Sequence, residues 1–434
     1  MPGWLKNPAS FLFMICLSLP LSAQDNQWNR FRGPNGSGIV PDSDVANEWS
    51  SDKNLKWKVE LPGPGSSSPI IEGDRVFVTC YTGYGLNAKD PGNRADLKRH
   101  LLCFDRQTGK ELWRAEVDSA GDEDEYRGFI TDHGYASSTP VSDGKQVFGF
   151  FGKSGVAAWD LDGKQLWQTN VGTFSDPAKW GAGASPMLYK DLVIVNAGIE
   201  GHALIALNKS DGSEAWRVED AKFTNSWSTP ILVEGDRTEL IYSVPGRILA
   251  FNPDSGESLW SADIPIKDAI TASVVAKDGV VYTLGGRQGK AVAIRCGGEG
   301  DVTESHTLWT QPVTSSIGTP LIFGDHLYWL GSGGIATCLN LKDGTEANKK
   351  RLRAPGPQRF PNSSYASPIV VGDKLIFVRR SGTVHVLKAG PEFEVIADNV
   401  FEADETRFSG TPAVGDGDMF FRSDEMLYCV RKDS

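Results

Sequence analysis

The sequence predicts an all-β protein, an eight-bladed β-propeller with four antiparallel strands in each blade. Three observations predict this fold. A Ser/Thr-Pro signal recurs about every 44 to 48 residues after one longer first step, a Gly-containing turn followed by Trp recurs beside it, and short apolar runs of strand length separate the turns. A fixed period of this size is typical of a propeller, a solenoid or an array, in which each unit buries its faces against its neighbours.

The Ser/Thr-Pro signal opens each unit. It reads Ser68-Pro69, Thr139-Pro140, Ser185-Pro186, Thr229-Pro230, Thr319-Pro320, Ser367-Pro368 and Thr411-Pro412, and Ala272-Ser273-Val274 fills the one gap in the series. Proline at the first position of a strand removes no ladder hydrogen bond, so the signal is compatible with a strand that starts there.

The fourth unit illustrates the strands that we expect in every blade. Four apolar runs of strand length follow one another at residues 229–233, 240–242, 248–251 and 259–262. Gly and Asx residues separate the runs, and these residue types favour tight turns. Four strands joined by hairpin turns form one meander, which is one propeller blade.

The third turn of a unit is followed by a Trp on the outer strand. The motif is complete in the first four units, is reduced to Leu308-Trp309 in the fifth, keeps its Gly but loses its Trp in the sixth, and is absent from the last two. The tryptophans expected to pack between blades are Trp57, Trp113, Trp167, Trp216, Trp260 and Trp309. Such a ring buries a large apolar area at low entropic cost.

The eighth unit stops one strand short, after residues 427–430. Residues 55–59 form a strand with no blade of their own and have the pattern of a fourth strand. We therefore expect residues 55–59 to complete the last blade and close the ring, which removes two exposed strand edges. The predicted boundaries are a signal peptide at 1–23, an N-terminal extension at 24–54 and the propeller at 55–431.

The first residues are typical of a secretory signal peptide. Lys6 precedes the apolar run 11–21, and Leu21-Ser22-Ala23 offers a cleavage site. The run is too short for a transmembrane helix, and no later run is longer. Ile15 precedes Cys16 where a lipid-anchor motif would have a small residue, which disfavours lipidation. We expect an exported, soluble protein, periplasmic or secreted. Its net charge of −11 argues against nucleic acid as a partner.

The cysteines allow two interpretations. Cys80 and Cys103 flank an insertion and could form a disulfide in an oxidising compartment. The aligned repeats favour another interpretation, because Cys103, Cys338 and Cys429 occupy the slot that Ala fills in units two to four. That slot requires a small buried residue, and free Cys behaves as one.

The Asp-x-x-Thr-Gly-Lys-x-x-Trp turn, together with the Ser/Thr-Pro opening, resembles the pyrroloquinoline-quinone (PQQ) repeat family of eight-bladed propellers. Residues 28–38, 131–140 and 151–155 are similar to exported PQQ-like propeller proteins of bacteria, and the resemblance covers roughly residues 28 to 431. It implies the propeller fold and leaves the function open, because one fold hosts many functions.

Two subgroups share the architecture that this resemblance implies. Quinoprotein dehydrogenases use PQQ, a calcium ion, an Asp base and adjacent cysteines, whereas the propeller lipoprotein of the outer-membrane β-barrel assembly machinery is a scaffold without a cofactor. The chain has no adjacent Cys pair and no lipid-anchor motif, so it matches neither subgroup fully. We expect a non-catalytic binding module for a protein, a glycan or a small anionic ligand, with no cofactor. The alternative is a PQQ-dependent oxidoreductase of alcohols or sugars, with PQQ and calcium.

The candidate binding residues occupy two sets of loops that share one face of a propeller. These loops precede the first strand of a blade or join its second and third strands. The candidates are Lys153, Arg247, Arg287, Arg379, Arg380 and Arg422, with His133, Trp180, Trp227 and Tyr365. A basic ring around aromatic side chains would suit an anion through charge-assisted hydrogen bonds. The alternative is that these are ordinary solvated turn residues.

No catalytic or metal-binding set is predicted. The acidic residues Asp118 and 122–125 lack the spacing of a calcium loop, and we expect a solvated loop there. The six His residues show no paired metal spacing, and no nucleophile-elbow motif is present.

Overall fold

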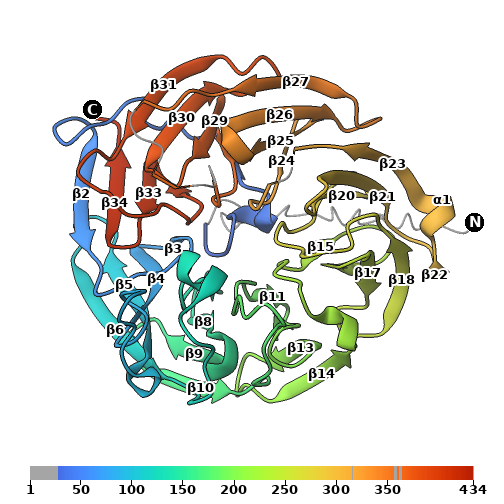
Figure 1. The fold of residues 1–434 in the computed structure, drawn as a ribbon, viewed down its shortest axis with the longest axis horizontal. Coiled ribbons are helices and arrows are strands. Elements are labelled where there is room, and N and C mark those ends of the chain that lie inside the picture. Colours follow the sequence, from blue (N-terminus) through green and yellow to red (C-terminus); the bar gives the residue numbers. More distant parts are fainter. Residues whose placement is uncertain (1–27, 315, 356–358, 361–363, 434) are drawn as a thin grey trace, which may run out of the picture.

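The computed structural model describes residues 28–433 apart from 315, 356–358 and 361–363, so the predicted signal peptide lies outside the described residues. Eight sheets stand around a central axis, and each contains four antiparallel strands, which follow in sequence order except where the N-terminal β2 completes the last blade (Figure 1). The predicted eight-bladed propeller is confirmed. In the part of the chain that the structure describes, no helix is long and apolar enough to cross a membrane.

The blades follow one another along the chain. Blades one to four comprise β3 (Ile70–Glu72), β4 (Arg75–Thr82), β5 (Lys98–Asp105), β6 (Glu111–Asp118); β7 (Val141–Ser142), β8 (Gln146–Phe150), β9 (Val156–Asp160), β10 (Gln165–Thr169); β11 (Met187–Tyr189), β12 (Leu192–Ala197), β13 (Ala203–Asn208), β14 (Glu214–Glu219); and β15 (Ile231–Val233), β16 (Glu239–Val244), β17 (Arg247–Phe251), β18 (Ser258–Asp263). Blades five to eight comprise β19 (Val275–Lys277), β20 (Val280–Gly285), β21 (Lys290–Arg295), β23 (Thr307–Pro312); β24 (Leu321–Phe323), β25 (His326–Gly331), β26 (Ile335–Asn340), β27 (Glu346–Arg351); β28 (Ile369–Val371), β29 (Lys374–Val378), β30 (Thr383–Lys388), β31 (Val395–Val400); and β32 (Ala413–Gly415), β33 (Asp418–Arg422), β34 (Met426–Arg431) with β2 (Leu55–Glu60).

Few other elements interrupt this pattern. Two short strands, β1 (Ile39–Val40) and β22 (Gly300–Asp301), add to blades seven and four in parallel. The helical turns are η2 (Pro34–Gly36), η3 (Arg94–Asp96), η4 (Gly128–Asp132), η5 (Gly152–Ser154), η6 (Ala221–Phe223), η7 (Ser332–Gly334) and α1 (Thr303–His306).

The ring closes through the N-terminal strand, as the sequence predicts. β2 pairs antiparallel with β34, in a register that places Trp57 opposite Cys429 and Val59 opposite Leu427. In Figure 1 the blue β2 lies along the red β34, so the two ends of the propeller share one blade. β2 therefore covers the outer edge of β34 and gives blade eight the same four strands as the other blades.

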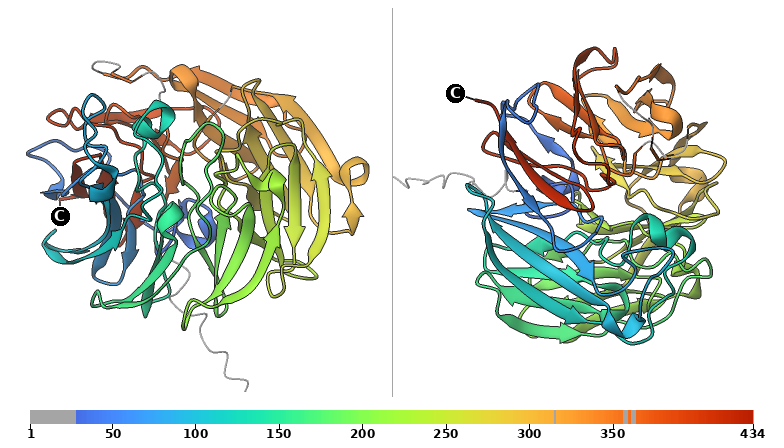
Figure 2. Two further views of the ribbon diagram at one scale, coloured as in Figure 1. Left: turned by 60° about the horizontal axis from the view of Figure 1, so that its bottom comes forward. Right: turned by 60° about the vertical axis from the view of Figure 1, so that its left-hand side comes forward.

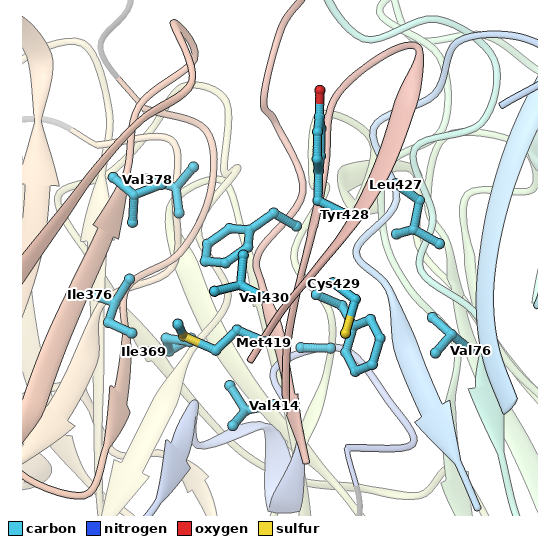
Figure 3. Close-up of a cluster of buried hydrophobic side chains, with 14 of the residues drawn as sticks. Val76, Ile369, Ile376, Val378, Val414, Met419, Leu427, Tyr428, Cys429 and Val430 are labelled. Carbon is cyan, nitrogen blue, oxygen red and sulfur yellow. The ribbon is translucent and has the colours of Figure 1, made fainter. Parts of the chain in front are cut away.

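The core consists of apolar layers between neighbouring blades. Figure 3 shows one layer, in which Met419 and Val430 of blade eight lie between Ile376 of blade seven and Val76 of blade one. These four side chains are fully buried. A blade is therefore stable only when both neighbours cover it, which is the physical basis of the repeat.

Five of the six repeated tryptophans make the same two contacts with the next blade. The indole N–H groups of Trp57, Trp113, Trp167, Trp216 and Trp309 donate to the backbone carbonyls of Arg106, Leu161, Lys209, Pro253 and Leu341, at 2.8–3.1 Å. The same rings cover the turn glycines of that next blade, where an added Cβ would come within 2.4–2.8 Å of ring carbons. The Trp of one copy of the motif thus contacts the Gly of the next copy, across the blade boundary.

This contact explains where the motif is incomplete. Blade five lacks the Asx-to-Gly turn of the motif, and Trp260 of blade four donates instead to the Glu239 carboxylate of its own blade, at 2.9 Å. The longer segment that replaces the turn of blade five contains β22, which pairs with β18 and places Gly300 beside Trp260. Blade six lacks the Trp, and the turn of blade seven lacks the motif, although it contains Gly390. At the boundary between blades six and seven, the Trp and the motif turn that would contact it are therefore both missing.

The five cysteines in the described part of the chain are free thiols, and the Cys80–Cys103 disulfide that the sequence allows is not formed. In the pairing of β4 with β5, Cys80 lies opposite His100 and Cys103 lies opposite Phe77. Cys103, Cys338 and Cys429 are fully buried. Cys103 pairs with Trp113, just as Ala206 pairs with Trp216, so the interpretation as small residues behind the outer strand is confirmed.

The segment after residue 28 enters the middle of the ring. The carbonyls of Trp28 and Asn29 accept hydrogen bonds from the backbone N–H groups of Ile71 and Ser142, and β1 pairs with β28 through Ile39 and Val370. In Figure 1 this blue segment crosses the centre of the ring, and Figure 2 shows it inside the propeller from two further directions. The N-terminal extension therefore joins the inner strands of blades one, two and seven.

Candidate functional site

The Ser/Thr-Pro signal forms a closed circle of hydrogen bonds around the central channel. In each blade, the backbone N–H of the Ser or Thr donates to the hydroxyl oxygen of its counterpart in the next blade, at 2.9–3.1 Å. The members are Ser68, Thr139, Ser185, Thr229, Ser273, Thr319, Ser367 and Thr411, and the last bond returns from Thr411 to Ser68. We call these eight residues the hydroxyl circle. Ser273, from the one unit without proline, takes its place in the circle.

A cavity of about 540 Å³ lies at this circle and is lined by all eight of its members. Loops that precede the first strands of the blades form its wall, and Phe31 of the N-terminal segment also lines it. Ile71, Ser142 and Val370, which hold that segment, each stand three residues after a member of the circle. The segment therefore crosses the channel below the hydroxyl circle, and Phe31 forms part of the cavity floor.

One wall of the cavity is aromatic. Trp180 and Trp227 stack with ring centroids 4.8 Å apart, and Phe129 continues the row at 4.7 Å from Trp180. The indole N–H of Trp227 donates to the Gly181 carbonyl at 2.6 Å, which fixes the position of that ring. Phe129 is 54% exposed, so the row runs from the cavity wall out to solvent.

The rest of the wall is polar and carries both signs of charge. It includes Asp132, His133, Asn225, Asp268 and Arg287. Nδ1 of His133 is 2.7 Å from the hydroxyl of Ser137. Burial lowers the pKa of His133 to about 4, so its imidazole is neutral at pH 7.

Tyr365 and Asp132 are held by a buried arginine behind the wall. The Arg380 guanidinium lies 4.1 Å from the centroid of the Tyr365 ring, and its Nη2 donates to the Asp132 carboxylate at 3.2 Å. The Tyr365 hydroxyl is 3.5 Å from the same carboxylate. Arg380 is 1% exposed and does not itself line the cavity.

The structure brings only some of the predicted site residues together. His133, Trp180, Trp227, Arg287 and Tyr365 line the cavity, whereas the remaining predicted basic residues do not. The sequence pattern did not single out Phe31, which reaches the cavity only through the path of the N-terminal segment. The sequence shows the members of the hydroxyl circle as a repeated Ser or Thr. That they line one cavity follows only from the closed ring, which brings all eight of them around the same channel.

Most of the predicted basic ring is part of the packing, which corrects that prediction. Lys153 donates to the Asp122 carbonyl at 2.6 Å, Arg379 donates to His385 at 2.8 Å, and Arg422 donates to the Thr79 carbonyl at 2.8 Å. Arg247 pairs with Asp263 at 3.5 Å. Sequence position places these side chains on the correct loops. The acceptors of Lys153 and Arg422 come from other loops or blades, whereas His385 and Asp263 lie in the same blade as the arginine that they bind.

The acidic loop is folded rather than solvated as a whole, contrary to our expectation. Both oxygens of Glu123 accept hydrogen bonds from Arg99 at 2.7 Å, and Asp124 is 3.6 Å from Lys153. Glu123 and Asp124 are buried, and the cost of removing their charges from water is offset because each carboxylate faces a cation. No group of His, Cys, Asp or Glu among the described residues is arranged to hold a metal ion.

Glu200 lies beside this buried network and supplies a testable pH dependence. It is 2% exposed, and burial raises its pKa to about 8 despite the nearby Lys153 and Arg99, with Glu123 raising it further. The folded protein therefore keeps a proton on Glu200 that the unfolded chain releases at the usual carboxyl pKa. Between the unfolded and the folded pKa of Glu200, the free energy of unfolding therefore falls as pH rises. We expect Glu200→Gln to melt higher than wild type at pH 8 and above, with the difference shrinking toward pH 5. A difference between the melting curves that does not change with pH would contradict this.

Comparison with known proteins places the chain in a family. The family model described as outer membrane protein assembly factor BamB matches residues 97–350 and 244–432, which together span more than half of the chain. The chain belongs to this family. This membership agrees with the PQQ-like repeats in the sequence and with the eight-bladed ring.

Two kinds of curated relative share part of the sequence. Outer membrane protein assembly factor BamB of Yersinia pestis is 26% identical over 237 residues, covering 50% of this chain and 57% of that protein. A polyvinylalcohol dehydrogenase of a Pseudomonas species is 27% identical over 205 residues, covering 37% of this chain and 31% of that protein. The matched region thus spans less than two thirds of either relative.

Solved structures show the same fold. BamB from Moraxella catarrhalis superposes with a TM-score of 0.60 at 13% identity, covering 87% of this chain and 97% of that one. Quinohemoprotein alcohol dehydrogenase from Comamonas testosteroni gives a TM-score of 0.50 at 12% identity, covering 95% and 82%. At such identities the likeness concerns architecture alone.

Proposed function

We propose that this chain is an exported, non-catalytic binding protein that takes its ligand into the central cavity from the loop face. The observation that carries the proposal is the cavity itself, which has an aromatic row on one side, hydrogen-bonding groups on the other and the N-terminal segment below. Ligand sites are typically concave, with apolar walls and a few directed polar groups. A family named for an assembly factor also supports binding rather than catalysis.

A saccharide fits this wall best. The flat faces of Trp180 and Trp227 offer a stacking surface for the C–H face of a sugar ring. Asp132, Asn225 and the neutral imidazole of His133 can accept or donate hydrogen bonds to hydroxyl groups. The two lining carboxylates, Asp132 and Asp268, oppose the two exposed lining cations, Lys267 and Arg287, so the mouth of the cavity favours a neutral or weakly charged ligand.

The residues of the cavity do not fit PQQ with calcium. None of the five described cysteines lines the cavity, and no described group of carboxylates or imidazoles is arranged for a metal ion. Asp132 is already bound by Arg380. The polyvinylalcohol dehydrogenase similarity keeps a redox function as the alternative, and the same binding experiment tests it.

We expect Trp227→Ala and Trp180→Ala each to weaken saccharide binding by about 1 kcal/mol or more, several-fold in Kd, because each removes one stacking surface. Isothermal titration calorimetry with neutral and acidic oligosaccharides, and with PQQ plus Ca²⁺, measures this. Phe174→Ala is the matched control, since Phe174 is an aromatic on the same face, 59% exposed, that does not line the cavity. Tight binding of PQQ with dye reduction, and no saccharide bound below millimolar, would support the oxidoreductase instead.

A further inference from the structure

The hydroxyl circle has hydrogen-bond donors that the protein does not use. Each hydroxyl oxygen of the circle accepts one backbone N–H from a neighbouring blade. Among the described residues, no acceptor takes the proton of any of these eight hydroxyls. A hydroxyl is one donor as well as an acceptor, so eight O–H donors remain beside the cavity. All eight residues are buried, and buried donors without acceptors are costly.

A buried positive charge lies next to this circle. Arg32 is 1% exposed and its Nη2 donates to the carbonyl of Pro320, at 2.7 Å, directly after the circle member Thr319. Its Nε has no partner in the described structure, and no described carboxylate lies within 4 Å of its guanidinium. Burial without a carboxylate lowers the pKa of Arg32 to about 9, which still leaves it charged at pH 7.

Both features call for a ligand that only accepts hydrogen bonds. Water would satisfy a donor but would leave the charge of Arg32 without compensation. A neutral sugar would offer acceptor oxygens to these hydroxyls but would bring no negative charge to compensate Arg32. A small oxyanion brings acceptor oxygens and negative charge together, and hydrogen bonds between hydroxyls and an anion are stronger than neutral ones.

We propose that the hydroxyl circle binds a small oxyanion, sulfate or phosphate, on the side of blades six and seven where Arg32 lies. Thr319 and Ser367 are the members of the circle nearest to Arg32 in the fold, because Arg32 contacts Pro320 and the following β1 pairs with β28. The oxyanion is either a free inorganic ion or the ester group of a larger ligand. The inference does not rest on the proposed function, because an inorganic ion binds without any saccharide.

The N-terminal segment creates this site. Without residues 28–40 the channel would keep the hydroxyls but would lose the floor that Phe31 helps to form and the positive charge of Arg32, which lies behind the lining beside Pro320. In the intact chain, the oxyanion binds between the circle, which all eight blades build, and the N-terminal segment, which lies outside the repeats. Its binding would also link the N-terminal segment to blades six and seven.

Calorimetry and thermal melting of the full mature chain test the proposal. Sodium sulfate and sodium phosphate are titrated at an ionic strength held constant with sodium gluconate. We expect saturable binding and a saturable rise in Tm, because an ion that binds only the folded state stabilises it. A sulfated and a phosphorylated monosaccharide are titrated as well. Tighter binding of either than of its inorganic ion identifies an ester group as the ligand, and equal binding identifies the free ion.

Paired variants locate the site. We expect Arg32→Gln to weaken sulfate and phosphate binding about ten-fold or more, because it removes the buried positive charge that the anion would compensate, and Arg32→Lys to retain most of the binding. Thr319→Val removes one hydroxyl donor and weakens binding, whereas Thr319→Ser retains it. Arg295→Gln is the matched control, because Arg295 is exposed on β21 in blade five, whereas Arg32 is buried beside Pro320.

Two results would overturn the proposal. One is the absence of any saturable effect of sulfate or phosphate beyond gluconate on the wild-type chain, which would mean that the circle holds only water. The other is a failure of the variants to differ from their controls. Either Arg295→Gln and Arg32→Gln would lose binding equally, or Thr319→Val and Thr319→Ser would bind equally well. If Arg32→Gln fails to fold, the Thr319 pair still decides. Sulfate binding without any saccharide binding would leave this inference standing and would contradict the proposed function.

Discussion

A chain that begins at Leu61 is expected to aggregate, whereas a chain that begins at Trp28 should melt like one that begins at Gln24, after the predicted signal peptide. The shorter chain lacks β2, so β34 loses its partner and an unpaired edge remains at the seam. It also loses the burial of Trp57 against the turn of blade one, where Gly109 packs on the ring. The ring would open at one boundary, and blades eight and one would each expose a face.

Size-exclusion chromatography and thermal melting of the two truncated chains measure this effect. The chain from Trp28 is the control, because it removes only residues outside the described structure. A chain from Leu61 that stays monomeric and melts within a degree or two of the control would show that β2 does not close the ring.

Replacement of Trp216 by Ala is expected to destabilise the protein by about 3–5 kcal/mol, the cost of a large-to-small change in a packed core. Trp216 is 8% exposed, donates to the Pro253 carbonyl at 3.1 Å and covers Gly256 of the next blade. The truncation therefore leaves a cavity at a blade boundary and one carbonyl without its donor. Because neighbouring blades stabilise each other, the loss extends beyond blade three.

Denaturant unfolding of Trp216→Ala and of Leu166→Ala measures the effect against a control. Leu166 is an outer-strand residue of blade two that is 40% exposed, so its truncation should change stability by well under 1 kcal/mol. A change below about 1 kcal/mol for Trp216→Ala would be too small for a core truncation and would mean that its contact with blade four does not stabilise the ring.

The local parts of the fold could be predicted from the sequence because each depends on neighbours in the chain. The Gly turns, the apolar strands and the Ser/Thr-Pro openings recur within one blade, and the structure confirms eight such blades. The place of β2 could also be inferred, since one strand was missing from the last blade and one was unassigned at the start.

The candidate site could be predicted only in part. His133, Trp180, Trp227, Arg287 and Tyr365 lie on loops that face the channel, as their positions in the repeat suggested. The other basic residues lie on the same kinds of loop, yet Lys153, Arg379 and Arg422 turn into the packing. The acceptors that decide this, such as the carbonyls of Asp122 and Thr79, belong to other turns and blades.

The sequence by itself determined the number of blades, the strands within them and the closure of the ring. These follow from hydrophobic patterning and turn chemistry, which act over a few residues. Only the tertiary structure decided that eight hydroxyls form one circle, that Phe31 and Arg32 lie below it, and that most of the basic side chains are already bound. The physical reason is that these contacts join residues up to 355 positions apart, and their geometry exists only once all the blades are in place.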